Sequence, residues 1–296
     1  MDDKRIISFD WAVKRMLRDK ANFGILEGLF QVLTGRQMRI VEILESEANQ
    51  LSDTDKFRSN FVRLLPEGRK NRVDIKAKDE NGNIIIVEVQ VNREIHYLER
   101  ILYGASKAIT EHIALGQGYE QVKKVYSISV LYFNIGEGSD YLYHGTTNFV
   151  GVHSNDTLKM NDKERKALKV ETPADIFPEY YLLRVNQFND VATTPLEEWL
   201  DYLKNQRISP DTTTAGLQQA RTRLAEMNMS DDEKAAYYRH LENLMIEKED
   251  ISTARAEGRE ESARAIAHRL LSAGIDKAII TQATGITEEE LSLMAQ

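Results

Sequence analysis

The chain of 296 residues contains no cysteine. It can therefore form no disulfide and offers no thiolate to a metal, which fits a reducing compartment, and we expect a cytoplasmic protein. No apolar run reaches the roughly 18 residues of a membrane span, and the N-terminus has no apolar signal segment, so we expect no membrane partner. The 6 histidines are scattered without ligand spacing, which argues against a histidine-based metal site.

Positive charge is also scarce, with 39 Lys and Arg against 47 Asp and Glu and a net charge of -8. The imbalance is uneven along the chain. Residues 1–170 carry 26 basic and 24 acidic residues, whereas residues 171–296 carry 13 and 23. Nucleic-acid-binding domains are usually basic, so the overall charge does not predict such binding, although it allows local contact with a polyanion in the first part.

The hydrophobic periodicity alternates between helical and strand spacing over the first 190 residues. The expected elements are two helices in 9–35 broken near 22–24, a short strand at 39–45, a hairpin of strands 69–79 and 84–91, a helix at 95–115, a strand at 125–135, one or two strands in 141–153, and a last strand at 180–188. This order predicts an α/β fold with a central mixed β-sheet flanked by helices.

From about residue 195 the composition favours helix, and 217–265 reads as long and charged. The end reads as three short helices. The segment "AIITQATGITEEELSLM" has the spacing of a helix-turn-helix, but its second helix begins with three glutamates that would repel phosphates. We therefore favour an oligomerisation or packing element over a DNA-reading helix.

The stretch "VDIKAKDENGNIIIVEVQ" (73–90) places two carboxylates, Asp74 and Glu88, on adjacent apolar strands. The Asn-Gly dipeptide predicts a tight turn between them. Centring the turn on this dipeptide sets Glu88 diagonally beside Asp74, whereas a shift of one residue sets the two directly opposite each other. Because side chains two apart share a face of a strand, Lys76 and Gln90 would lie beside the acids.

Two carboxylates this close on an apolar wall repel each other, and a hard divalent cation such as Mg²⁺ or Mn²⁺ relieves the repulsion. Such an ion could then activate water and polarise a phosphodiester. The alternative is a hairpin with scattered surface charges, in which Lys76 neutralises one of the acids. The spacing alone leaves both interpretations open.

At these residues the sequence resembles the PD-(D/E)XK nuclease superfamily, and it is most similar to the branch of Rpn-type recombination-promoting nucleases and PD-(D/E)XK family transposases. The matching pieces are "FDWAVKRML", the hairpin above, "ERILYGASKAITEHI" and the helical ending. The resemblance covers residues 1–155 well and the last 40 residues loosely. It implies a restriction-endonuclease-like core, with a helical C-terminal extension, and a DNA endonuclease that depends on Mg²⁺ or Mn²⁺.

The resemblance also implies roles for the hairpin residues. Asp74 and Glu88 would hold the metal, with the Val89 carbonyl as a third ligand. Gln90 stands where many members of the superfamily have the catalytic lysine. An amide can orient water or phosphate but carries no charge, and Lys76 could supply the missing charge.

Three more residues are candidates by the same resemblance. Asp10, in the first helix, would complete the site; the alternative is that it only caps that helix. Arg100 and Tyr103 lie about one helical turn apart and would face DNA phosphates, although a tyrosine at such a position is more often packed in the core.

We therefore predict a nuclease domain at 1–190, a helical extension at 191–250 and a charged helical tail at 251–296 that could form homo-oligomers. The predicted function is metal-dependent hydrolysis of DNA phosphodiesters. One alternative is a nuclease fold that has lost catalysis and binds nucleic acid or protein. A further alternative is a structural or toxin-antitoxin-like partner that acts through the acidic tail.

Overall fold

The computed structural model describes residues 6–44, 74–113 and 117–294. The chain divides into two compact units, Met1–Asn228 and Met229–Gln296. The boundaries expected after residues 190 and 250 do not coincide with this division, and the functional assignment of those three parts stays a prediction.

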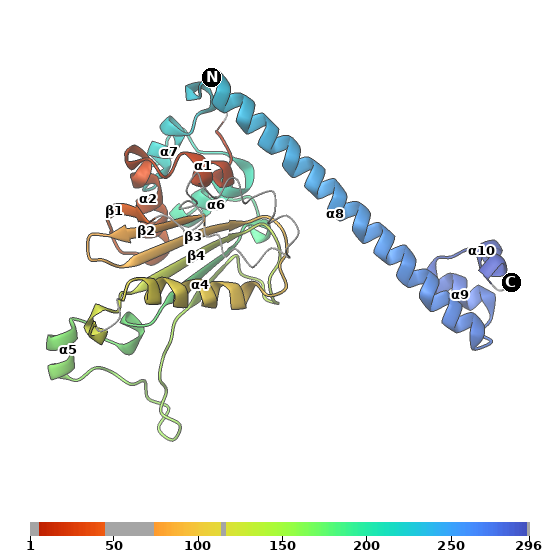
Figure 1. Cartoon of the computed structure of the whole chain (residues 1–296), viewed down its shortest axis with the longest axis horizontal. Helices are drawn as coiled ribbons and strands as arrows, with labels where there is room; N and C mark the ends of the chain where they lie inside the picture. Colours follow the sequence, from red (N-terminus) through yellow and green to blue (C-terminus); the bar gives the residue numbers. More distant parts are fainter. Residues whose placement is uncertain (1–5, 45–73, 114–116, 295–296) are drawn as a thin grey trace, which may run out of the picture. The chain divides into compact units, whose positions relative to one another are not determined.

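The first unit is built on a six-stranded sheet with the order β1-β2-β3-β4-β6-β5 (Figure 1). The strands are β1 (Ile40–Leu44), β2 (Ile75–Asp79), β3 (Ile84–Gln90), β4 (Val125–Leu131), β5 (Leu142–Gly145) and β6 (Glu179–Arg184). The pairs β3–β4 and β4–β6 are parallel, and the other three pairs are antiparallel. The predicted α/β class with a mixed sheet is confirmed.

The β2–β3 hairpin turns through Gly82, whose positive φ of 81° favours glycine. The Asp79 carboxylate stabilises the turn by accepting hydrogen bonds from the backbone N–H groups of Asn81 (2.9 Å) and Asn83 (2.7 Å). The strands then pair Ile75 with Val87. Of the two registers left open by the sequence, the structure has the shifted one.

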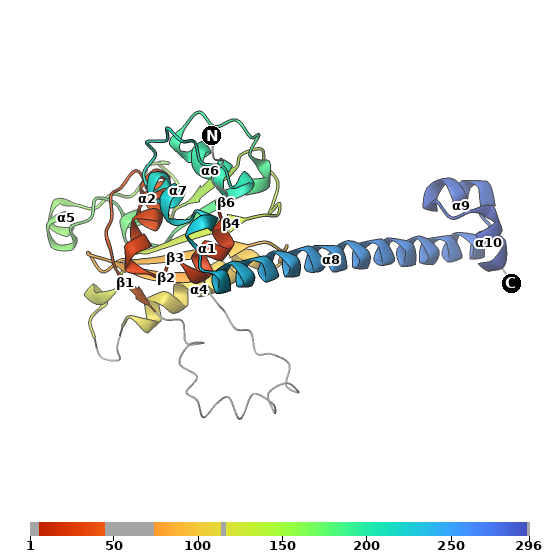
Figure 2. The same cartoon turned by 90° about the horizontal axis from the view of Figure 1, so that it is seen from above.

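Helices cover both faces of this sheet (Figures 1 and 2). They are α1 (Phe9–Arg15), α2 (Phe23–Thr34), α4 (Tyr97–Glu111), α6 (Pro195–Asn205) and α7 (Leu217–Arg223). On one face, Ile84 and Ile86 of β3 pack with Ala105 and Ala108 of α4. On the other face, Phe30 of α2 meets Tyr126 of β4 edge-to-face at 5.0 Å. Side chains that alternate along β3 and β4 therefore reach two different cores.

One described helix departs from the sequence expectations. The short helix α5 (Asp162–Leu168), which is stabilised by an Asn161–Glu164 capping box, was not expected. One strand, β5, forms in the segment 141–153, which agrees with the one or two strands expected there, and an isolated bridge joins Val150 to Thr157. The beginning of the expected strand at 69–79 lies partly outside the described residues.

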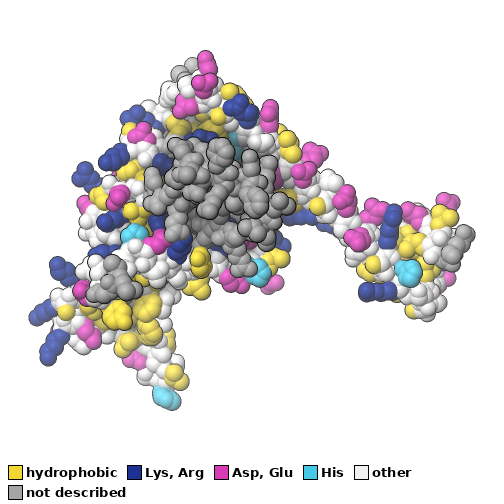
Figure 3. Space-filling view, in the orientation of Figure 1, with side chains coloured by type: hydrophobic (Ala, Val, Ile, Leu, Met, Phe, Trp, Pro, Cys, Tyr) yellow, Lys and Arg dark blue, Asp and Glu magenta, His cyan; other side chains and the backbone are white. Residues whose placement is uncertain are grey.

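The second unit consists of α8 (Asp231–Ser272), α9 (Lys277–Thr284) and α10 (Glu288–Met294). The first of the three short helices expected at the end is thus the last part of α8. Ala267, Ile280 and Leu291, one from each helix, form a small core. Acidic and basic side chains both lie along the exposed surface of this unit (Figure 3). None of the helices among the described residues has the length and apolar character that a membrane crossing requires.

Candidate active site

Asp74 and Glu88 lie at the same end of the β2–β3 hairpin. Asp74 directly precedes β2, and continuing the Ile75–Val87 pairing by one residue sets it opposite Glu88. Glu88 shares the strand face of Ile86, which packs under α4. The hairpin therefore brings both predicted acids to one edge of the sheet, by which we mean the strand ends opposite the hairpin turn. This result depends on the shifted register.

Asp74 is half-buried and is held through its main chain and its side chain. Its Oδ2 accepts a hydrogen bond of 2.6 Å from the backbone N–H of Val89, and Arg18 Nη2 donates to its carbonyl oxygen at 2.7 Å. Burial raises the pKa of Asp74, the Val89 N–H and the charge of Lys14 oppose the rise, and the charge of Asp10 adds to it. The carboxylate is thus tied to the strand that carries Glu88.

Glu88 is only 3% exposed. Its Oε2 lies 3.5 Å from both the Tyr97 hydroxyl and Arg100 Nε, a distance at which hydrogen bonds are weak. Burial raises the pKa of Glu88 to about 7, Arg100 opposes this rise, and Asp74 adds to it. A buried carboxylate with such distant partners is costly to ionise, which is the condition under which a bound cation would stabilise it most.

Asp10 is buried in the first turn of α1, where Ser8 occupies the N-cap position. The alternative that Asp10 caps this helix is therefore wrong. Phe9 anchors α1 by edge-to-face contacts with Trp199 (6.2 Å) and Tyr202 (6.0 Å) of α6. The charge of Asp10 raises the pKa of Asp74, so Asp10 acts electrostatically on the edge of the sheet that holds Asp74.

The two other hairpin candidates differ in their surroundings. Lys76 forms an ion pair with Glu111 at the end of α4, so its charge is already matched there. Gln90 is half-buried at the last position of β3, paired with Leu131 of β4. Among the described residues, no three or more His, Asp or Glu side chains are grouped as a ligand set. Any cation at this edge would accordingly depend on two carboxylates supplemented by backbone oxygen or water.

Helix α4 contributes more to this edge than the sequence indicated. Arg100 lies beside Glu88 and also contacts Glu94 Oε2 through Nη1 at 2.9 Å. Tyr103 is 58% exposed, so the alternative that it packs in the core is wrong, while its contact with DNA phosphates stays a prediction. Tyr97 was missed, although it lies one turn from Arg100 on the same helical face, a spacing that is visible in the sequence.

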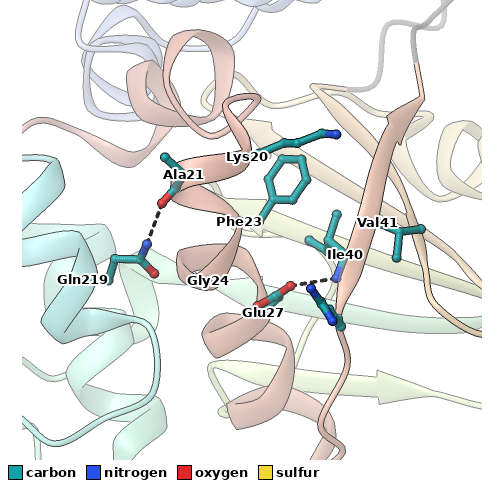
Figure 4. Close-up of a pocket in the computed structure, with 9 residues that line it drawn as sticks. Lys20, Ala21, Phe23, Gly24, Glu27, Ile40, Val41 and Gln219 are labelled. Atoms are coloured by element: carbon teal, nitrogen blue, oxygen red, sulfur yellow. Dashed lines mark hydrogen bonds between the residues drawn. The ribbon is translucent and has the colours of Figure 1, made fainter.

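Two cavities in the first unit lie away from these acids. One of about 680 Å³ is lined by α2, β1 and Gln219, and there Glu27 accepts the Ile40 N–H at 2.7 Å (Figure 4). The other, of about 330 Å³, is an apolar groove between α4 and the β5–β6 edge, with Leu98 and Leu102 in its wall. Neither is lined by the predicted site residues.

The acidic hairpin lies on a helix-flanked mixed sheet, and the comparisons with known proteins place a chain of this sequence in a nuclease family. Residues 8–254 match the family model described as PD-(D/E)XK nuclease family transposase, and residues 260–296 match the model described as the C-terminal HTH domain of the Rpn/YhgA-like nuclease family. The chain belongs to the PD-(D/E)XK nuclease family transposases. Searches of curated proteins and of solved structures found no match.

The second match corrects our preference for an oligomerisation element over a helix-turn-helix at the end of the chain. The three glutamates of α10 lie in its first turn, where negative charge favours the helix N-terminus. Glu290 also accepts hydrogen bonds from the Thr287 backbone (2.9 Å) and hydroxyl (2.8 Å). These acids therefore stabilise the start of the helix, a role that the argument from repulsion between glutamates and DNA phosphates does not consider. Oligomerisation through the tail stays a prediction.

Proposed function

We propose that this protein is a metal-dependent DNA endonuclease that hydrolyses phosphodiester bonds, with Asp74 and Glu88 as the metal-holding pair. The observation that carries the proposal is the hairpin register, which brings both carboxylates to one edge on the side of α4. Membership of a nuclease family supports the reaction class, and the match to an HTH domain supports DNA as the partner.

The donor set fits a hard cation such as Mg²⁺ or Mn²⁺. Glu88 is buried without a partner closer than 3.5 Å among its described contacts, and the charge of Asp74 raises the cost of ionising Glu88 further. Carboxylate oxygens, supplemented by the Val89 carbonyl and water, suit such an ion. The bound cation would supply polarisation of the phosphodiester and of the attacking water.

The protein's own residues would position the reactants. Arg18 and the Val89 N–H hold Asp74 from two sides, which limits the movement of its carboxylate. Gln90 lies two residues beyond Glu88 on the same strand face and would orient water or a phosphate oxygen through its amide. Asp10 would add negative charge from α1, which would strengthen the attraction for the cation.

The proposal is tested by plasmid nicking with the purified full chain in Mg²⁺ or Mn²⁺. Asp74→Ala should abolish nicking while the circular dichroism spectrum and the thermal unfolding midpoint show a folded protein. Glu80→Gln, an exposed acid in the turn at the other end of the hairpin, is a matched control for loss of one acidic charge and for contaminating nucleases. Nicking that survives Asp74→Ala would remove the mechanism.

Two observations favour a second function, that of a nuclease fold without catalysis that binds nucleic acid or protein. The Arg100 guanidinium already lies beside Glu88, and Gln90 replaces the customary lysine. Calorimetric titration with Mn²⁺ separates the two functions. Binding that disappears in Glu88→Gln supports the nuclease, whereas no binding, or binding unaffected by this substitution, supports the binding module.

The HTH match leads to a separate expectation for the second unit. Removing residues 260–296 should weaken binding of the full chain to a DNA duplex, with a smaller salt dependence, while the Mn²⁺ affinity stays the same. Unchanged DNA affinity would assign the tail another role, such as the predicted oligomerisation, which sedimentation of the same variant would measure.

A further inference from the structure

Arg100 connects a buried acid to an exposed one. Its Nε lies 3.5 Å from Glu88 Oε2, and its Nη1 lies 2.9 Å from Glu94 Oε2. The exposed fractions of the three side chains rise from 3% for Glu88 through 22% for Arg100 to 38% for Glu94. The guanidinium therefore spans from the buried edge of the sheet towards solvent.

The two contacts differ in kind. A distance of 2.9 Å is that of a charge-assisted hydrogen bond, whereas 3.5 Å to Glu88 is a longer electrostatic contact. Glu94 is thus the closer partner, and Glu88 is neutralised only from a distance. Because Arg100 is anchored on α4, its guanidinium can change partner by side-chain rotation while the helix stays in place.

A divalent cation on Glu88 would lie close to this positive guanidinium, and the two would repel. The cation and Arg100 therefore compete for Glu88. When Arg100 leaves Glu88 it stays near the site through Glu94, at the half-exposed end where a DNA phosphate could accept its hydrogen bonds.

We propose that Arg100, held by Glu94, is a positioning residue. A divalent cation that binds Glu88 displaces the Arg100 guanidinium, which then binds a DNA phosphate, so that the site binds metal and DNA cooperatively. This inference rests on the proposed function of Asp74 and Glu88. Coupling between the two ligands is reciprocal, since DNA that engages Arg100 favours the cation by the same factor by which the cation favours DNA.

The inference predicts opposite effects for the two partners of one ion pair. Arg100→Gln removes the competitor, and Mn²⁺ should bind about tenfold tighter, within the usual range of such coupling. Glu94→Gln removes the closer partner of Arg100, which then settles on Glu88, and Mn²⁺ should bind correspondingly weaker. A merely structural ion pair would shift the Mn²⁺ affinity of both variants in the same direction or leave it unchanged.

The experiment is calorimetric titration of Mn²⁺ into the full-length protein and these two variants, with Arg93→Gln as a control that removes the same charge from the preceding loop. The anisotropy of a labelled DNA duplex, measured in EDTA and in Ca²⁺, gives the second readout. Wild type should gain more DNA affinity from the cation than Arg100→Gln does. Thermal unfolding of each variant confirms that it is folded.

The possible failures are distinguishable. If Mn²⁺ binds wild type and Glu88→Gln abolishes binding, but Arg100→Gln binds no tighter, this inference is overturned and the proposed function stands. If wild type itself binds no Mn²⁺, both are overturned. An increase in affinity in Arg93→Gln equal to that in Arg100→Gln would show a general charge effect and would also overturn the inference.

Discussion

The burial of Glu88 leads to a prediction about stability that does not depend on nuclease activity. The perturbation is Glu88→Gln, which keeps the size of the side chain and removes its ability to ionise. In wild type, burial raises the pKa of this carboxyl from an ordinary 4.5 to about 7, with Asp74 adding to the rise and Arg100 opposing it. The folded chain therefore holds a proton that the unfolded chain releases between these pH values.

The sign and the size follow from proton linkage. Because the folded state binds more protons between pH 4.5 and 7, the free energy of unfolding falls as pH rises through this window. A pKa difference of this size corresponds to about 3 kcal/mol. We expect Glu88→Gln and wild type to have similar stability near pH 5 and the variant to be more stable by up to about 3 kcal/mol at pH 8.

The assay is urea unfolding followed by tryptophan fluorescence at a series of pH values. The chain has 2 tryptophans, Trp11 and Trp199, and both belong to the first compact unit, so the signal reports on that unit alone. Adding Mn²⁺ at pH 8 should stabilise wild type and leave Glu88→Gln unchanged. A stability difference that stays constant from pH 5 to pH 8 would refute the reasoning, since it would mean that Glu88 titrates normally.

Three further substitutions test other parts of the first unit. Gly28→Ala would place the new Cβ on α2 against the backbone of Ala215. We expect the free energy of unfolding, measured in urea, to fall by about 3 kcal/mol. A variant as stable as wild type would contradict the packing of α2 on this segment. Thr194→Ala removes the capping-box hydroxyl of α6 and should cost about 1 kcal/mol by the same assay; no loss would mean that the cap contributes nothing. Lys76→Met should leave the calorimetric Mn²⁺ affinity unchanged because Glu111 already holds Lys76, and a marked loss would make this lysine part of the site.

Much of the fold was predictable because the relevant signals are local. The broken helix at 9–35, the hairpin and the helix at 95–115 have strong periodicity or an Asn-Gly turn, and each is present as α1 and α2, β2 and β3, or α4. The missed helix α5 is short and has no buried residue, so no apolar stripe marked it.

The candidate site was only partly predictable. Asp74 and Glu88 were identified from an apolar hairpin that carries two acids, but the sequence left two registers open. Glu94 and Arg18 were missed because nothing in their neighbourhood along the chain marks them: Arg18 acts on Asp74 across 56 residues. The role of Glu94 depends on where the side chain of Arg100 reaches.

By itself the sequence determined most of the elements, the turn and the family, because periodicity, turn residues and motif order are properties of neighbouring positions. Only the tertiary structure decided which register the hairpin has, that Arg100 lies between Glu88 and Glu94, and that Lys76 belongs to Glu111. The physical reason is that charge pairing and burial depend on distances through space. These distances are set by packing α4 on the sheet, and spacing along the chain does not encode them.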